Sequence, residues 1–267
     1  MFDKTITSKD NSNIKLFQKL VTLKKARDEH NLFPLEGLRL INDAIAENSV
    51  LHCVFISEKL ASKYSEAIEA LDKKGYSDRI FYVTPEVERK LSGTVNPQGI
   101  YAICKKLDKF FNADKILDNG KYIILNDVRD PGNIGTVIRT ADAVGVDGII
   151  LTGDCCDIYN PKAVRSTMGS LFRMNIMHSG DIADALKAFH DKKAKSFAAV
   201  VEADALSLTE CDFSGTCVVV IGNEGSGLSS EAADLCNQRL TIKMQGGINS
   251  LNAAMAAGII MWEMFRQ

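Results

Sequence analysis

Three polar loops in the second half of the sequence carry the side chains whose types and spacing suit chemistry. They span 126–135, 221–229 and 242–252, and each follows a short apolar run that predicts a buried strand. In open α/β sheets, ligands bind beyond the carboxyl ends of the strands. We therefore expect a ligand, and the groups that act on it, at these three loops.

The first loop joins a predicted strand to a predicted helix. Pro131 and Gly132 predict a tight turn, and Asn133 is expected to cap the helix that follows. Arg139 lies one to two turns into that helix. The motif suits an active-site loop, and it equally suits a plain strand–turn–helix joint in which Arg139 pairs with Asp142 three residues further on.

The second loop is rich in glycine. Gly222, Gly225 and Gly227 let a ligand approach the backbone closely. Their order matches neither G-x-G-x-x-G nor the Walker pattern, which disfavours the two common nucleotide-binding loops. Taken alone, the segment also fits a structural turn in which Glu224 caps a neighbouring segment.

The third loop precedes a final apolar helix. We expect Asn249 or Ser250 to cap this helix. Small residues between 253 and 258 make the helix thin, so that another element can pack close to its backbone. The loop therefore fits a ligand site at a helix start, or a polar cap on a core helix.

In this order and at these separations, the three loops resemble the three motifs of the SpoU (TrmH-type) RNA ribose methyltransferases, within the SPOUT class. The matching stretches are D-P-G-N-x-G at 130–135 with R-T-A-D-A at 139–143, G-N-E-G-x-G-L at 222–228, and S-L-N at 250–252. A weaker match falls at 163–172. The resemblance covers 121–267 closely. The piece Phe33–Gly37 resembles, less specifically, the ribosomal-protein-like substrate-binding domain that often precedes SpoU domains.

The resemblance implies a fold and a cofactor that local patterns do not indicate. The fold is a mostly parallel sheet whose C-terminal part forms a deep trefoil knot, an exception to the usual rules of chain connection. The cofactor is S-adenosyl-L-methionine, held largely by backbone at Gly222, Ile242 and Leu251. This sequence departs from the family at Lys243, where proline is usual.

The resemblance also implies the reaction, methylation of a ribose 2′-hydroxyl in RNA. The catalytic and substrate-site positions of the family match Arg139, Asn133, Glu224, Ser250 and Asn252. A ribose hydroxyl is a poor nucleophile until it loses its proton, and in the family the counterpart of Arg139 is thought to assist that loss. Because a guanidinium keeps its proton up to about pH 12, a second role is open: Arg139 grips an RNA phosphate and stabilises the developing alkoxide. No metal is implied, since the electrophile is the sulfonium.

The elements that must position these residues follow from the hydrophobic pattern. From 121 to 267, strand-type runs alternate with helical segments, which predicts an α/β domain with a mostly parallel sheet covered on both faces. Within it we expect a strand at 171–177 and a final helix at 250–265. Residues 1–105 predict a smaller α/β domain that binds the RNA substrate, and the polar segment 106–120 is the expected linker.

We expect two helices near the start of the first domain. The first is amphipathic, and the second spans 36–46. Apolar residues recur at helical spacing from Ile14 to Val21, and basic residues outnumber acidic ones in the first 40 positions. Lysines lie on the outer side of the first helix at Lys15, Lys19, Lys24 and Lys25. This side suits an RNA backbone, and it equally fits a solvated helix face.

Composition narrows the class of protein. The 267 residues, 46% hydrophobic and 25% charged, are typical of a globular protein with room for two domains, and the net charge of -2 gives no sign of nucleic acid. Neither the 7 cysteines nor the 4 histidines show the spacing of a disulfide framework or a metal site. The apolar stretch Ala253–Met261 is too short to span a bilayer, so we expect a soluble, cytoplasmic protein without a membrane partner.

Alternatives of other classes remain open on sequence alone. One is a non-catalytic RNA-binding protein of the same fold, which the intact motif residues disfavour. Another is an enzyme that acts on small molecules with an unrelated nucleotide cofactor, which the missing Rossmann and Walker patterns disfavour. As substrate, ribosomal RNA is favoured over transfer RNA by the first domain. The family's pairing of knots and the apolar last helix predict a homodimer built from the C-terminal domain.

Overall fold

The computed structural model of the chain describes residues 4–92 and 97–266. The chain forms two compact units. The first contains Met1–Leu107 together with Tyr159–Phe172, and the second contains Asp108–Ile158 and Arg173–Gln267. The segment with the weaker motif match therefore folds with the first unit, although it lies between motifs of the second.

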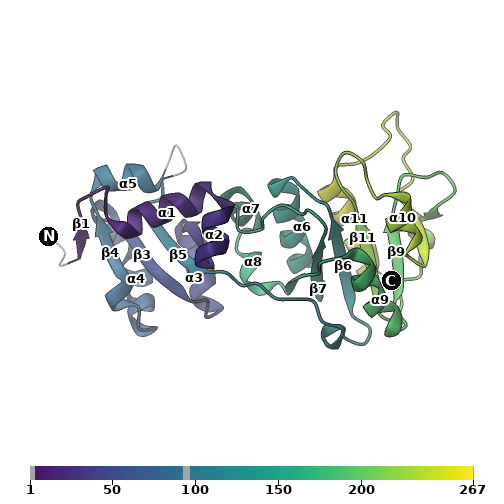
Figure 1. Ribbon diagram of the computed structural model, residues 1–267, viewed down its shortest axis with the longest axis horizontal. Helices are drawn as coiled ribbons and strands as arrows, with labels where there is room; N and C mark the ends of the chain where they lie inside the picture. Colours follow the sequence, from purple (N-terminus) through teal and green to yellow (C-terminus); the bar gives the residue numbers. More distant parts are fainter. Residues whose placement is uncertain (1–3, 93–96, 267) are drawn as a thin grey trace. The chain divides into compact units, whose positions relative to one another are not determined.

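The first unit is built on a five-stranded mixed sheet with the order β1-β4-β3-β5-β2 (Figure 1). β1 and β3 run parallel to β4, whereas β5 runs antiparallel to both β3 and β2. The strands are β1 (Thr5–Ile6), β2 (Leu32–Glu36), β3 (Leu51–Ser57), β4 (Ile80–Val83) and β5 (Ile100–Lys105). The helices are α1 (Ser12–Thr22), α2 (Lys24–His30), α3 (Leu38–Ala46), α4 (Ser65–Lys73) and α5 (Pro85–Leu91).

Helix α1 follows the amphipathic pattern, whereas the second expected helix begins later than predicted. The side chains of Ile14 and Phe17 are fully buried, or nearly so, in one core cluster with Phe55. The expected helix start at Glu36 is wrong, because Leu32–Glu36 forms the edge strand β2. An edge strand tolerates the missing N–H of Pro34, so proline there does not exclude a strand.

The segment Tyr159–Phe172 packs on the first unit through aromatic side chains. The ring centroids of Phe33 and Tyr159 lie 4.7 Å apart, and the Tyr159 hydroxyl accepts a hydrogen bond from the backbone N–H of Leu107 at 2.7 Å. Helix α7 (Pro161–Thr167) lies in this segment and contacts β2. Gly169, with a φ of +94°, faces Asp43 so closely that a Cβ would lie 1.7 Å from its carboxylate.

The expected strand at 171–177 is wrong over its first half. Met168 and Gly169 both adopt positive φ, which ends α7 and starts the short helix α8 (Ser170–Arg173); the strand β8 (Ile176–His178) comes only afterwards. The apolar positions between 171 and 176 suit both periodicities, so the pattern alone did not separate helix from strand.

The second unit contains a seven-stranded sheet in which every neighbouring pair is parallel, with the order β10-β12-β9-β11-β6-β7-β8. Figure 1 labels β9, β11, β6 and β7 of this sheet. Its remaining strands are β6 (Lys121–Asn126), β7 (Gly148–Thr152), β9 (Lys195–Ala199), β10 (Leu206–Ser207), β11 (Cys217–Ile221) and β12 (Gln238–Thr241). Its helices include α6 (Pro131–Val144), α9 (Ile182–Asp191), α10 (Ser230–Asp234) and α11 (Ala253–Arg266).

Both faces of this sheet are covered, as the alternating pattern predicted. Tyr122 and Val218 pack with Phe189 of α9 in one core cluster, while Ile123 and Val219 point to the opposite face and are also fully buried. Helices α6 and α11 pack against each other. The expected parallel α/β fold is therefore confirmed, and the trefoil knot stays a prediction. In the described part of the chain, no helix is both long and apolar enough to cross a membrane.

Candidate active site

A cavity of about 460 Å³ opens at the carboxyl ends of β9, β11 and β12. After β6 the chain adds β7 and β8 on one side, and later β9, β11 and β12 on the other, so the sheet has a topological switch point beside β6. Such a point is the usual ligand site of an open parallel sheet. The expected cofactor contacts Gly222, Ile242 and Leu251 line this cavity, and so do Glu224 and Ser250.

Asn133 connects the three loops, and it is not the helix cap that we expected. Helix α6 begins at Pro131, and Asp130 caps it by accepting hydrogen bonds from the N–H groups of Gly132 and Asn133 at 2.7 and 2.9 Å. The Asn133 side chain is thereby left to donate to Glu224 Oε1 at 3.0 Å and to accept from Asn252 Nδ2 at 2.9 Å.

Glu224 uses both carboxylate oxygens to hold the first loop. Its Oε2 accepts the N–H of Arg129 at 3.1 Å, and its Oε1 accepts the N–H of Asp130 at 3.0 Å as well as Asn133. Partial burial alone raises the pKa of this carboxyl, but the hydrogen bonds from Asn133, Asp130 and Arg129 outweigh it and lower the pKa below the ordinary value. Glu224 is therefore an ionised anchor rather than a base near neutral pH.

Asn252 caps the last helix. Its Oδ1 accepts the N–H groups of Ala254 and Met255 at 2.9 and 3.3 Å, and α11 begins at Ala253. The expectation that Asn249 or Ser250 caps this helix is therefore wrong. Several polar residues precede the apolar stretch, and the sequence alone does not show which of them is followed by the first helical turn. Ser250 remains exposed at the cavity.

Arg139 is exposed on α6 and does not pair with Asp142. The Asp142 carboxylate instead accepts two hydrogen bonds from Arg173, at 3.0 and 2.8 Å. Within 4–92 and 97–266, no hydrogen bond or ion pair involves the Arg139 side chain. Its guanidinium is therefore available to an anionic ligand.

The glycine loop is closed on itself. Asn223 and Gly227 exchange backbone hydrogen bonds at 3.1 and 3.0 Å, and a Cβ on Gly222 would lie only 2.4 Å from the Gly227 backbone. The Asn223 side chain donates to the carbonyl of Asp127 at 2.8 Å and accepts the N–H of Gly225 at 2.8 Å. Sequence reasoning missed Asn223, whose only signal was its place inside the second motif.

The cavity suits a cation with an apolar ring. Glu202 and Glu224 supply carboxylates to its lining, and among the lining residues that the structure describes there is no Lys, Arg or His. Ile221, Ile242 and Leu251 add apolar wall. The apolar wall suits the adenine ring of S-adenosylmethionine, and the described lining places no basic side chain against its positively charged sulfonium. The described residues contain no group of three or more His, Cys, Asp or Glu side chains placed to hold a metal ion.

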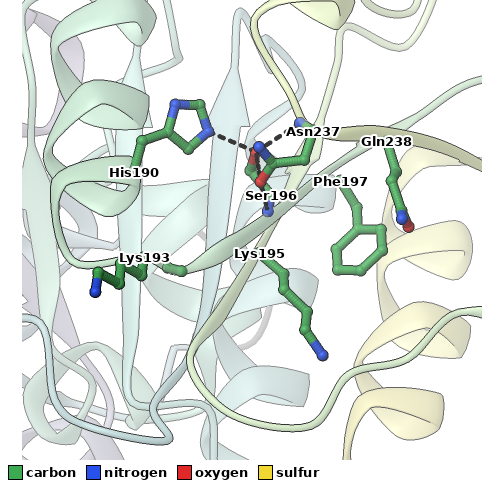
Figure 2. A pocket seen from close by; sticks show the side chains of 8 residues that line it. His190, Lys193, Lys195, Ser196, Phe197, Asn237 and Gln238 are labelled. Carbon is green, nitrogen blue, oxygen red and sulfur yellow. Dashed lines mark hydrogen bonds between the residues drawn. The ribbon is translucent and has the colours of Figure 1, made fainter.

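A second cavity, at the amino ends of β9 and β12, contains a serine and a histidine in contact (Figure 2). His190 Nε2 lies 2.8 Å from Ser196 Oγ, which also accepts the N–H of Asn237 at 2.9 Å. Ser196 is fully buried, so its hydroxyl is not accessible to a substrate. This network ties α9 to the starts of two strands, at the opposite edge of the sheet from the motif loops.

Comparison with known proteins agrees with this geometry. Residues 120–262 match the model of the SpoU rRNA methylase family, and residues 11–102 match an MRM3-like substrate-binding domain. An uncharacterized tRNA/rRNA methyltransferase of Synechocystis is 31% identical, covering 98% of this chain and 94% of its own length. The 23S rRNA (guanosine(2553)-2'-O)-methyltransferase RlmP of Bacillus subtilis is 28% identical over 98% of this chain and 99% of its own. The AdoMet-bound rRNA methyltransferase from Sinorhizobium meliloti superposes with a TM-score of 0.85 at 30% identity, covering 98% and 97% of the two chains.

The fold is an open parallel sheet with a cavity beyond the carboxyl ends of its strands, the usual ligand site of this class of α/β protein. The three motif loops meet beside that cavity. The chain belongs to the SpoU rRNA methylase family. It is an RNA methyltransferase, and its cofactor is S-adenosylmethionine.

Proposed function

We propose that this enzyme methylates the 2′-hydroxyl of a ribose in ribosomal RNA. The observation that carries the proposal is the bridge through Asn133, which joins Glu224 and Asn252 and so brings all three motif loops together next to the cavity. The names of the relatives support the same reaction, since one of them methylates a guanosine 2′-oxygen in 23S rRNA.

We assign a role to each side chain from its exposure and its hydrogen-bond partners. Bound in the cavity, S-adenosylmethionine supplies an electrophilic methyl group. Arg139, exposed and without a protein partner among the described residues, binds the RNA phosphate and stabilises the oxyanion that develops on the ribose. Asn133 and Asn252 hold the ribose hydroxyl in line with the methyl group, while Glu224 keeps the loops in place.

The cofactor is held mainly by backbone groups. Gly222 and Leu251 border the cavity at the glycine loop and at the entry to α11, and Ile242 follows β12. Ser250 borders the same space. Lys243, which replaces the usual proline, is exposed between the lining residues Ile242 and Met244, and its side chain does not line the cavity.

The substrate is assigned to ribosomal RNA rather than transfer RNA. Support comes from the match of residues 11–102 to an MRM3-like substrate-binding domain and from relatives named for rRNA. We assign RNA recognition to residues 1–105 and the transfer to 121–267; of the expected linker 106–120, residues 108–120 fold with the second unit. The segment 159–172 adds surface to the first unit.

The active form is proposed to be a homodimer that pairs through α11. Four apolar side chains lie on one side of this helix at spacings of four, three and three residues, and all of them are exposed: Met255 at 59%, Ile259 at 39%, Trp262 at 65% and Phe265 at 40%. An apolar stripe of this kind is typical of an interface. A second copy of the chain buries it by two-fold pairing.

Mapping of 2′-O-methylation across all cellular RNA, with and without this protein, tests the proposed reaction. One ribosomal position should lose its methyl group without the protein, and the purified enzyme with S-adenosylmethionine should restore it. Loss of a methyl group at a transfer RNA position instead would replace the substrate assignment. If no 2′-O-methyl group changes, the proposal is wrong.

A further inference from the structure

Glu202 occupies a distinctive place in the cofactor cavity. It follows the end of β9 by three residues, and it borders both the 460 Å³ cavity and a neighbouring cavity of about 370 Å³. No motif contains it, and the reaction described above does not use it. A carboxylate on the wall of a cavity can accept hydrogen bonds from a ligand as well as from the protein.

The carboxylate of Glu202 is held in a fixed position. Both of its oxygens accept hydrogen bonds from Arg239 Nη1, at 2.6 and 2.7 Å, and Arg239 Nη2 in turn pairs with Asp234 at 2.6 Å. The Glu202 side chain is 36% exposed. Each carboxylate oxygen has two lone pairs, so the ion pair leaves Glu202 capacity to accept further bonds from a ligand. Glu224, the other carboxylate of the lining, already has three donors.

The strand order shows which part of the cofactor Glu202 meets. β9 lies beyond β11 as seen from β6, and β6 is the strand that leads into α6 with Asn133 and Arg139. The methyl group must face these two residues. Glu202 therefore lies on the side of the cavity away from the methyl group, where the adenosine or the amino-acid end of the cofactor must lie.

The donors of the cofactor differ in how well they suit a carboxylate. The α-ammonium shares its carbon with a carboxylate, which Glu202 would repel. The adenine amino group adjoins the acceptor N1, whose lone pair would repel a carboxylate oxygen of Glu202 that approached the amino group. The ribose 2′- and 3′-hydroxyls are uncharged, and both can turn their hydrogens towards one carboxylate, as an acidic residue does for ribose in dinucleotide-binding folds.

We propose that Glu202 accepts hydrogen bonds from the ribose hydroxyls of S-adenosylmethionine, and that Arg239 positions it for this contact. The inference rests on the cofactor cavity assigned above. It makes Glu202 a specificity residue for a ribose rather than a deoxyribose cofactor. It also separates this part of the site from the methyl-transfer groups at Asn133 and Arg139.

Calorimetric titration of the full chain tests the contact, with S-adenosylhomocysteine and its 2′-deoxy and 3′-deoxy counterparts as probes. Wild-type protein should bind at least one deoxy compound roughly tenfold to a hundredfold more weakly than S-adenosylhomocysteine, the range expected for a hydrogen bond to a charged group. Glu202→Gln should bind S-adenosylhomocysteine more weakly by a similar factor. The affinity of this variant for the deoxy compounds should be little lower than its affinity for S-adenosylhomocysteine.

Glu231→Gln is the matched control, because Glu231 is exposed on α10 and does not border the cavity. It should behave as wild type with all three compounds. The proposal is overturned if wild-type protein binds both deoxy compounds as tightly as S-adenosylhomocysteine, a result that needs no variant to fold. It is also overturned if Glu202→Gln lowers the affinity for all three compounds by the same factor relative to wild type. Failure of the cofactor assignment itself looks different, since wild-type protein would then bind none of the three.

Discussion

Arg139 and Glu224 are both charged residues of the motif loops, but their surroundings give them different roles. The Arg139 side chain is exposed without a described protein partner, whereas both oxygens of Glu224 are occupied by N–H donors. A group that acts on a substrate must have bonding capacity left for it. On this criterion we propose that Arg139 contacts the reacting RNA, and that Glu224 acts through the loops that it positions.

Replacement of Arg139 should stop the reaction without affecting the cofactor. We predict that Arg139→Ala lowers kcat by roughly a hundredfold or more, as loss of an oxyanion-stabilising donor does. Arg139→Lys should fail as well, because an ammonium lacks the planar fork that binds phosphate. Methylation of the mapped RNA and calorimetry with S-adenosylmethionine measure the two effects. Near-normal turnover by either variant would contradict the assignment.

Replacement of Glu224 should lower stability in a pH-dependent way. Glu224→Gln has one acceptor oxygen instead of two for the N–H groups of Arg129 and Asp130, and we expect a loss of about 1–2 kcal/mol in the free energy of unfolding near pH 7. The pKa of Glu224 is lowered in the folded state, so its contribution is complete above the ordinary carboxyl pKa. It is lost as the pH falls through the folded pKa.

Urea unfolding of both proteins between pH 7 and pH 3 measures this effect. The difference between wild type and variant should shrink towards the acid end. A difference that stays constant over this range would show that the Glu224 carboxylate charge is not what ties the loops together.

At the scale of elements, the site depends on hydrogen bonds between the loops that follow the strands. The loop after β11 clamps the loop after β6 through Asn223 and Glu224, and Asn252 joins the start of α11 to the same place. A change in one loop therefore reaches the others. The strands themselves are buried on both faces and give the loops a rigid base.

Gly222 provides a test of this coupling. Because a Cβ there would lie 2.4 Å from the Gly227 backbone, Gly222→Ala must shift the loop itself rather than fill the cavity. We predict weaker S-adenosylmethionine binding together with a lower melting temperature. Gly225→Ala is the control, since its Cβ would meet only Asn223 Oδ1, at 3.5 Å. Unchanged cofactor affinity in Gly222→Ala would contradict the proposed role of this loop.

Most of the lysines on the basic side of α1 and α2 are already paired with acidic side chains. Lys15, Lys24 and Lys25 each pair with a nearby acid, whereas Lys19 has no ion pair among the described residues. We predict that Lys19→Glu weakens RNA binding and reduces the salt dependence by about one counterion. Lys25→Glu, next to Glu29, is the comparison variant and should have the smaller effect. Equal salt slopes for wild type and Lys19→Glu would show that this face does not contact RNA.

At the scale of the whole molecule, the chain forms two compact units, to which we assign RNA recognition and chemistry respectively. The first holds the match to a substrate-binding domain, and the second holds the cavity and the interlocked loops. Each unit is made of two separate segments of the chain, because Tyr159–Phe172 folds with the first unit. The last helix leaves an apolar stripe exposed, which a single copy of the chain does not cover.

The homodimer is tested by the mass of the protein in solution. Light scattering should give about twice the 29.2 kDa of the chain. Trp262→Glu places a charge in the stripe and should shift the mass towards the monomer. Leu117→Glu, at an exposed apolar residue outside α11, should not. A wild-type monomer at micromolar concentration that still methylates RNA would rule out the interface.

The sequence by itself determined the class of fold and where the chemistry lies. Alternating apolar runs predicted the parallel sheet because strands buried on both faces must be apolar throughout, as in Cys217–Ile221. The motif loops could be placed because their polar and glycine residues interrupt these runs at fixed positions. These are local properties, and neighbouring residues are sufficient to show them.

Only the tertiary structure decided which polar side chain takes which partner. Asn133 was expected to be a cap and instead bridges two loops that lie 91 and 119 residues away in sequence. Asp142 pairs with Arg173 rather than Arg139, and Glu202, in no motif, lies on the cavity wall. Hydrogen bonds depend on distances of about 3 Å between atoms, and the order of residues along a chain does not specify distances between segments that are remote in sequence.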